Sequence, residues 1–359
     1  MSRLRLARTA LTLFGGVVAL ALPLVLVPLT THTGWSTIGA RFQQLTLVQL
    51  GLLGAIWFGG LFVHTYVTTG ALPGLSHRRA LVLNFSGSTV SHLAPFGGVL
   101  GMGLNFTMLR SWGYDGSDFT VLVLLNNAWN ALVRLLLPAV ALALLVACTD
   151  HGAHGLLPVA FISMFAFVGI AFAVRLATRN PGNRDPGPFQ RTATAALSRL
   201  AGHPAHEVIA ALRTEVGQVV RRSWRRMSLG MSVYVLLQAT LLYLCLVCVG
   251  GTVSPLGVFA AYATGAALTL VPLTPGGVGF AEAGTAGLLV AFGANPAAAA
   301  AGVILYSTFT RWMEIPFGAA GTAWWWIRRT PMPALHADQP PAIPRLYDPG
   351  TALASQYGA

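Results

Sequence analysis

Long apolar runs separated by short polar segments dominate the chain, and six of them reach roughly the 20 residues that an α-helix needs to cross a bilayer. We predict full membrane spans over residues 10–30, 44–67, 119–148, 156–176, 229–250 and 298–327. Two further apolar stretches, residues 80–109 and 256–292, are interrupted near the middle by Pro and Gly. The pattern predicts an all-α, polytopic membrane domain over residues 1–330 and a disordered tail over residues 331–359.

The two interrupted stretches carry helix-breaking tips, Leu93-Ala-Pro-Phe-Gly-Gly98 in the first and Leu273-Thr-Pro-Gly-Gly277 in the second. Proline removes a backbone donor and clashes with the preceding helical turn. Non-helical backbone at membrane depth is tolerated only where it is buried in protein or lines a cavity. We therefore expect a binding cavity beside the prolines and glycines of the tips, which are Pro95, Gly97, Gly98, Pro275, Gly276, Gly277 and Gly279.

Composition supports a membrane protein, since 55% of the residues are hydrophobic and only 9% are charged. The formal net charge is +12, but the arginines lie in terminal and connecting segments, where membrane proteins carry cytoplasmic positive charge. Residues 177–228 alone contain nine arginines and three acidic residues. We interpret this charge as a signal of membrane orientation, with both termini on the cytoplasmic side of the plasma membrane and no nucleic-acid partner.

The arginines also predict how the interrupted stretches enter the membrane. Arg78 and Arg79 precede residues 80–109 and Arg110 follows them, so both ends of this stretch are expected on the cytoplasmic side. Residues 256–292 lie between a span that leaves the cytoplasm and a span that returns to it, so both of their ends are expected outside. We predict two re-entrant hairpins that are inserted from opposite faces.

Each predicted hairpin is followed by a span with an arginine deep inside it. Arg134 lies 39 residues after Pro95, and Arg311 lies 36 residues after Pro275. This similar spacing predicts an inverted repeat, which many transporters use to form a site near the bilayer midplane.

Arg134 is the first candidate for binding at such a site. An arginine at the centre of a span costs about 2.5 to 3.5 kcal/mol on insertion scales, so it usually faces the bundle interior or a water-filled cavity. At about 100° per residue, Asn127 and Asn130 share a helix face with Arg134, and no acidic residue lies nearby in the same helix. We expect Arg134, Asn127 and Asn130 to contact an anionic group.

Arg311 shares its helix face with Glu314, and both are candidates for the wall of the same cavity. Two interpretations stay open: Arg311 binds the anionic group together with Arg134, or it forms a structural ion pair with Glu314 or Glu282. Glu282 follows the second tip, where the N-terminal amides of a half-helix favour an anion. Its carboxylate can complement the helix dipole, pair with an arginine or carry a proton.

Residues 206–226 repeat apolar positions at helical spacing, with arginines between them. The pattern predicts an amphipathic cytoplasmic helix. This helix either lies on the anionic inner leaflet, with membrane phospholipids as its partner, or docks on the helix bundle.

The run from Pro272 to Glu282, followed by an apolar half-helix and a span with Arg311, resembles the transmembrane, flippase-like region of lysylphosphatidylglycerol synthases. The resemblance extends over residues 10–327. It implies a lipid-translocating fold that acts on a phospholipid or a related anionic or aminoacylated lipid. The family motif maps onto Pro275, Gly276, Gly277, Gly279 and Glu282. Only about 32 residues follow the last predicted span, so we do not expect aminoacyl transfer from this chain.

The sequence therefore favours a transporter or flippase that binds an anionic or aminoacylated phospholipid, or a lipid-linked substrate, in a midplane cavity. One alternative is a membrane-embedded enzyme that modifies a lipid phosphate with Glu282 or His92 as acid or base. A non-transporting partner subunit of a lipid-synthesis complex is another. No nucleophile–base pair or metal-ligand cluster supports the enzyme, so we expect neither catalysis nor a metal or cofactor. The pattern leaves the oligomeric state open.

Overall fold

The computed structural model describes residues 21–93, 97–148, 157–178, 205–270 and 278–329, and these ranges contain helices and turns but no strand. The predicted all-α architecture is therefore confirmed for the described residues. The first part of span 10–30, the tail over 331–359 and the tip residues Pro95, Pro275, Gly276 and Gly277 lie outside these ranges. In chain order the elements are the helical segment Ala21–Thr31, α2 (Trp35–Phe42), α3 (Leu47–Ala71), α4 (His77–Leu93), α5 (Gly97–Ser111), α6 (Gly116–Cys148), α7 (Leu157–Thr178), α9 (Ala205–Cys248), α10 (Pro255–Leu268), α11 (Phe280–Ala291), α12 (Pro296–Ser307), η3 (Thr308–Trp312) and α13 (Glu314–Arg328).

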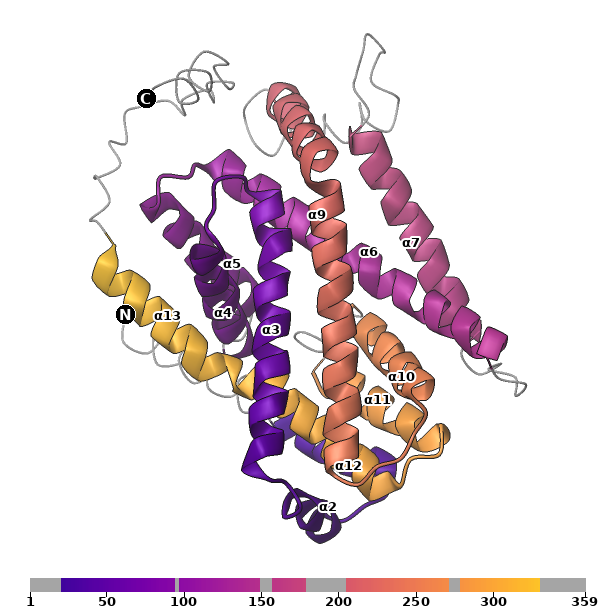
Figure 1. Cartoon of the computed structure of the whole chain (residues 1–359). Coiled ribbons are helices and arrows are strands. Elements are labelled where there is room, and N and C mark those ends of the chain that lie inside the picture. The colour runs from indigo at the N-terminus through magenta and orange to yellow at the C-terminus, as the bar shows by residue number, and fades with distance from the viewer. Residues whose placement is uncertain (1–20, 94–96, 149–156, 179–204, 271–277, 330–359) are drawn as a thin grey trace, which may run out of the picture.

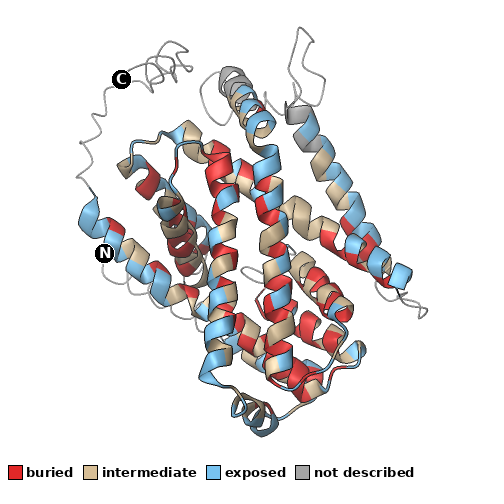
Figure 2. Cartoon of the chain, viewed as in Figure 1, coloured by how far each residue is buried: buried red, intermediate tan, exposed pale blue. Residues whose placement is uncertain are grey.

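Three helical segments of the described chain are long and apolar enough to cross a membrane, namely Leu47–Ala71, Gly116–Cys148 and Thr214–Cys248. At 1.5 Å per residue each is about 38 Å or longer, which exceeds the hydrocarbon core of about 30 Å. Much of helix α7 is coloured as exposed in Figure 2. Its exposed large apolar residues include Phe165, which is 85% exposed. Such a surface is suited to lipid and not to water.

Helices α3 and α9 run antiparallel through the centre of the bundle (Figure 1). Small residues bring them together: a Cβ on Gly70 would lie 2.6 Å from Met227 Cγ, and a Cβ on Gly230 would lie 2.9 Å from Tyr66 Cβ. These contacts place the C-terminal end of α3 beside the middle of α9. At the opposite end, Arg41 donates to the Val249 carbonyl at 3.5 Å, just beyond the end of α9.

Two pairs of short helices, α4 with α5 and α10 with α11, lie where the sequence predicts hairpins. Helix α4 follows the end of α3 after a short turn, and α10 follows the end of α9 in the same way. Because α3 and α9 are antiparallel, the two pairs start at opposite ends of the bundle (Figure 1). Their helices contain 12 to 17 residues, so each is between about 18 and 26 Å long and shorter than the hydrocarbon core.

Helix α9 differs from the expected division of this region into an amphipathic helix over 206–226 and a span over 229–250. The structure has one helix of 44 residues, Ala205–Cys248. The sequence Arg226-Met-Ser-Leu229 contains no proline or glycine, so nothing in the backbone stops the helix between the two predicted parts.

The predicted last span over 298–327 is divided in the structure into α12, the π-helical turn η3 and α13. The Met313 amide donates to the Thr308 carbonyl at 2.9 Å, which is the five-residue bond of a π-turn. Pro316 has no N–H to donate to the Trp312 carbonyl four residues earlier. The regular helical ladder is thus interrupted next to Arg311.

Candidate functional site

Two neighbouring polar cavities lie between the helix pairs and the central helices. The first has a volume of about 260 Å³, and its wall comes from α4, α6, α9, α10, α11, α12 and η3, with Glu314 at the start of α13. The second, of about 340 Å³, lies between α3, α4, α5, α6 and α9 and also reaches Glu314. Five residues line both cavities and form a shared wall: Ser88, Asn130, Arg134, Tyr234 and Glu314.

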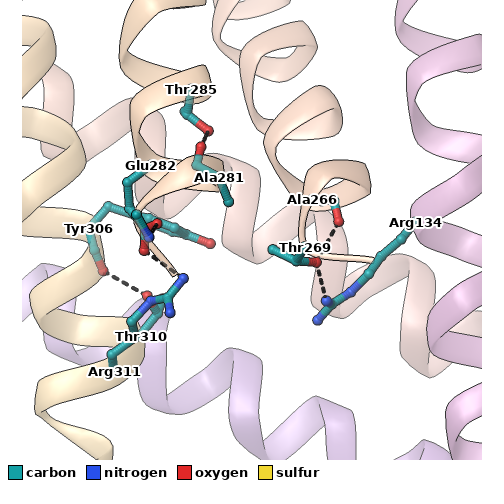
Figure 3. Close-up of polar contacts among 10 residues, drawn as sticks. Arg134, Ala266, Thr269, Ala281, Glu282, Thr285, Tyr306, Thr310 and Arg311 are labelled. Atoms are coloured by element: carbon teal, nitrogen blue, oxygen red, sulfur yellow. Dashed lines mark hydrogen bonds and ion pairs between the residues drawn. The ribbon is translucent and has the colours of Figure 1, made fainter. Parts of the chain in front are cut away.

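Arg134 belongs to this shared wall. Its Nη1 donates to Thr269 Oγ1 at 2.6 Å, and the Thr269 hydroxyl in turn donates to the Ala266 carbonyl at 2.6 Å (Figure 3). Among the described residues, no carboxylate pairs with Arg134. A guanidinium carries five N–H donors, so the bond to Thr269 leaves further donors of Arg134 without a partner among the described residues.

Arg311 is bound differently. Its Nη2 lies 2.5 Å from Glu282 Oε1, and the Glu282 side chain is only 5% exposed. Glu282 Oε2 also accepts a hydrogen bond from the Gly279 amide at 2.7 Å. Of the two acidic partners that the sequence left open for Arg311, the structure therefore selects Glu282 over Glu314.

The same carboxylate caps the start of α11. Gly279 precedes the helix with φ +88°, a conformation that L side chains rarely adopt. Because Glu282 accepts from its amide, the helix N-terminus that the sequence suggested as an anion seat is partly satisfied from within the chain.

Both arginines converge on the second helix pair from different parts of the chain. Arg134 contacts Thr269 at the C-terminal end of α10, whereas Arg311 contacts Glu282 in the first turn of α11 (Figure 3). These two contacts flank residues 271–277, which contain Pro275 and lie outside the described residues. The two arginines therefore do not make equivalent contacts, as an inverted repeat would suggest, because both guanidinium groups bind the pair α10 with α11.

The other predicted site residues fall into two groups. Asn127, Asn130, Gly98 and Glu314 line the second cavity. Asn130 and Glu314 also line the first, together with Arg311 and Glu282. Each of them therefore lies beside space that a ligand can enter.

Gly97 and Gly279 do not line either cavity, and close packing explains them instead. A Cβ on Gly97 would lie 2.6 Å from the Val90 carbonyl oxygen, so this glycine permits α5 to start against the end of α4. A Cβ on Gly279 would lie 2.8 Å from Leu22 Cγ. Close packing accounts for both glycines, and their role in binding stays a prediction.

Sequence reasoning missed several residues of the first cavity. Thr269 and Gln238 are part of its wall, as are three tyrosines from three different helices, Tyr234, Tyr262 and Tyr306. Gln238 Nε2 donates to Tyr234 Oη at 2.9 Å. The i,i+4 spacing of Tyr234 and Gln238 predicts that these two meet on α9, but no spacing rule brings them to Tyr262, Thr269 and Tyr306 on other helices.

His92, at the end of α4, also lines the first cavity, and its buried Nδ1 has no hydrogen-bond partner among the described residues. The same part of the chain contains no group of three His, Cys, Asp or Glu residues that is arranged to hold a metal ion. The geometry is suited to binding an anion with a guanidinium and neutral polar side chains.

Comparison with known proteins identifies the family of the chain. No curated protein shows significant similarity to the chain. A family model described as the lysylphosphatidylglycerol synthase TM region matches residues 12–318, which include both cavities and both helix pairs. With its apolar helices and this match over most of its length, the chain is a membrane protein that belongs to the family of the lysylphosphatidylglycerol synthase TM region.

Proposed function

We propose that this protein moves an anionic lipid across the membrane and binds the head group in the cavity wall formed around Arg134. The substrate class comprises anionic or aminoacylated phospholipids and related lipid-linked molecules. One observation carries the proposal: Arg134 lines both cavities, and no carboxylate pairs with it in the described chain. An arginine held inside a membrane protein without an acidic partner is suited to a phosphate.

The two arginines have different roles in this proposal. Arg311 is neutralised by Glu282 at 2.5 Å, so it contributes less net charge to the cavity than Arg134 does. Arg134 is the primary ligand of the phosphate, and Arg311 keeps the start of α11 in place. Release of Arg311 from Glu282 would supply a second cation at a later stage of transport.

The short helix pairs support an alternating-access arrangement. In this proposal α4 with α5, and α10 with α11, enter the bilayer as re-entrant hairpins from opposite faces. Their helices are too short to cross it, and the pairs start at opposite ends of the bundle. Six full spans complete the protein, and both termini lie on the cytoplasmic side of the plasma membrane.

The N-terminal part of α9 supports this orientation. Arg221, Arg222 and Arg225 are exposed on it, and a basic helix surface is attracted to anionic lipids of the inner leaflet. We propose that this surface contacts the leaflet from which substrate is drawn.

Reconstitution into liposomes tests the proposal. Purified protein is inserted into vesicles with a fluorescent phosphatidylglycerol analogue, and its movement between leaflets is followed by chemical quenching of the outer leaflet. We expect wild-type protein to accelerate movement and Arg134→Ala to reduce the rate about tenfold or more, because a charge-assisted contact to the phosphate is lost. The matched control is Arg110→Ala, which removes an exposed arginine at the end of α5.

The same vesicles distinguish the alternatives. Mass spectrometry of the lipids after incubation reports any new lipid species. A modified lipid formed without movement between leaflets would identify an enzyme, and the absence of both activities would leave the role of a partner subunit. Either outcome contradicts lipid transport.

A further inference from the structure

The second cavity has an unusual lining, because five carboxamide side chains face it from α4, α5 and α6. They are Asn84, Asn105, Asn126, Asn127 and Asn130. A carboxamide offers an acceptor oxygen and two N–H donors but no charge. A wall of this kind is uncommon in a membrane protein interior, where unpaired polar groups are destabilising.

Two of these amides have a side-chain oxygen without a hydrogen-bond donor among the described residues. Asn105 Oδ1 on α5 and Asn126 Oδ1 on α6 are buried and have no hydrogen-bond partner among the described residues. They lie on different helices of the cavity wall, so a single helix cap or turn does not account for both. Buried acceptors of this kind require donors.

Close contacts hold Asn105 and Asn130 in the cavity wall. Asn105 lies against Gly87 of α4, where a Cβ would lie 2.7 Å from Asn105 Nδ2. Asn130 Nδ2 donates to the backbone carbonyl of Asn126 at 2.9 Å, which fixes the Asn130 side chain on α6. Asn84, in contrast, is occupied by His64 at 3.3 Å and by Thr68 at 3.4 Å, so its role is structural.

The charge of the cavity lining indicates which kind of ligand donor can bind these oxygens. The charged residues that line this cavity are Arg134 and Glu314, one of each sign, and they do not form an ion pair. The remaining polar lining is mainly carboxamide and hydroxyl, so the cavity has no excess negative charge to attract an ammonium group. Hydroxyl groups match it better, because each donates to a carboxamide oxygen and accepts from a carboxamide N–H.

From these observations we infer that the second cavity binds the uncharged polyhydroxyl part of a lipid head group, such as glycerol, inositol or a sugar, while Arg134 at the shared wall binds its phosphate. The inference rests on the proposed lipid transport and specifies the substrate of the same site. Asn105 and Asn126 are the residues that recognise the hydroxyl groups. A cationic head group is disfavoured.

The test compares lipids with and without hydroxyl groups. Asn105→Leu and Asn126→Leu replace a carboxamide with an apolar side chain of similar size. Gln218→Leu, on the exposed part of α9, removes an amide outside the cavity and serves as control. Vesicles carry fluorescent phosphatidylglycerol, phosphatidylinositol or phosphatidic acid, and lysylphosphatidylglycerol is supplied as the cationic competitor. Size-exclusion profiles and melting temperatures in detergent verify that each variant is folded.

We expect each asparagine variant to slow transport of the two hydroxylated lipids about tenfold, because one or two hydrogen bonds to the head group are lost. Transport of phosphatidic acid should stay within about twofold of wild type. Arg134→Ala should slow all three lipids. Equal loss for phosphatidic acid, or faster wild-type transport of lysylphosphatidylglycerol than of phosphatidylglycerol, would overturn the inference.

A binding measurement separates this inference from transport itself. If wild-type protein moves no lipid, the proposed function fails, but the affinity of detergent-purified protein for dioctanoyl lipids still tests the cavity. Tighter binding of dioctanoyl phosphatidylglycerol than of dioctanoyl phosphatidic acid, lost in Asn126→Leu, supports the polyhydroxyl site. Equal affinities contradict it. If glycerol 3-phosphate binds as tightly as the dioctanoyl lipid, the ligand is a soluble phosphate ester. The cavity then still recognises hydroxyl groups, but a lipid substrate is excluded.

Discussion

The guanidinium of Arg311 and the carboxylate of Glu282 lie 2.5 Å apart and join the π-helical turn η3 to the start of α11. Glu282 also accepts a hydrogen bond from the Gly279 amide. The same carboxylate therefore binds Arg311 of η3 and caps the N-terminus of α11. A π-turn places a side chain outside the regular helical register, and such turns are frequent at functional sites. A single substitution at Arg311 or Glu282 would therefore remove this connection between η3 and α11.

Glu282→Gln should destabilise the protein more than removal of both charges does. The single change leaves Arg311 without its counter-ion in a mostly buried position, which costs about 3 kcal/mol for buried pairs. The double variant Glu282→Gln/Arg311→Met removes both charges and should recover part of the loss. Melting temperatures in detergent measure the difference, and an equally low melting temperature for the double variant would contradict an energetic role of the pair.

Thr269→Val should weaken substrate binding without unfolding the protein. The change keeps the side-chain volume but removes the hydroxyl that accepts from Arg134 Nη1 at 2.6 Å. Without this contact the guanidinium is less well oriented, and we expect the half-saturating lipid fraction in the transport assay to rise about tenfold. Thr269→Ser retains the hydroxyl and should behave like wild type; similar losses in both variants would exclude the hydroxyl as the cause.

Two glycines of α13 offer a matched pair for testing helix packing. A Cβ on Gly318 would collide with the Phe85 carbonyl and with Thr89 Oγ1 of α4, whereas a Cβ on Gly321 would make ordinary contacts at 3.6 Å and beyond. We expect Gly318→Ala to destabilise the protein by about 1 to 3 kcal/mol, because rigid backbone on α4 must move. Gly321→Ala should leave the melting temperature nearly unchanged. The reverse order would show that α4 and α13 do not pack closely.

His77, the first residue of α4, precedes the hairpin predicted over residues 80–109 and gives a pH dependence. Its Nδ1 lies 2.6 Å from Thr65 Oγ1, and its Nε2 lies 3.3 Å from Arg226 Nη2. The Thr65 hydroxyl donates to the Phe62 carbonyl at 2.6 Å, so Nδ1 is the donor to Thr65, and Nε2 is left to accept from Arg226. This hydrogen-bond pattern requires neutral His77.

Burial and, secondly, the charge of Arg226 lower the pKa of His77 from its ordinary value of 6.5. The folded protein therefore binds a proton at His77 less readily than the unfolded chain does. The stability contributed by neutral His77 is present above pH 6.5 and is lost as the pH falls below that value. We expect the melting temperature to drop on acidification more steeply in wild type than in His77→Gln. Parallel pH profiles would exclude His77 from this dependence.

Local patterns in the sequence were sufficient to predict the class of protein and most helix positions. Apolar length predicted α3, α6 and α7 to within a few residues, and the Pro/Gly tips predicted the division into the pairs α4 with α5 and α10 with α11. The family was indicated by the motif that ends at Glu282 and is confirmed by the match over residues 12–318. Each of these inferences uses residues that are neighbours in the chain.

Helix continuity was predicted less well. The sequence suggested separate elements over 206–226 and 229–250 and one unbroken span over 298–327. The structure has the single helix α9 in the first case and a π-turn before α13 in the second. Polarity changes along a helix do not stop it when the backbone contains no breaker. Pro316, in contrast, removes a backbone hydrogen bond from the turn before it, so the helix is interrupted even inside an apolar run.

The sequence by itself determined that this chain is an all-helical membrane protein with arginines inside apolar helices, because hydrophobic length and backbone restriction are local properties. Only the tertiary structure decided that Arg311 pairs with Glu282 and not with nearby Glu314, and that Arg134 reaches Thr269, 135 residues away. It also brought Asn105 and Asn126 to one cavity. These relationships depend on distances between helices that are remote in sequence, and helix periodicity carries no information about such distances.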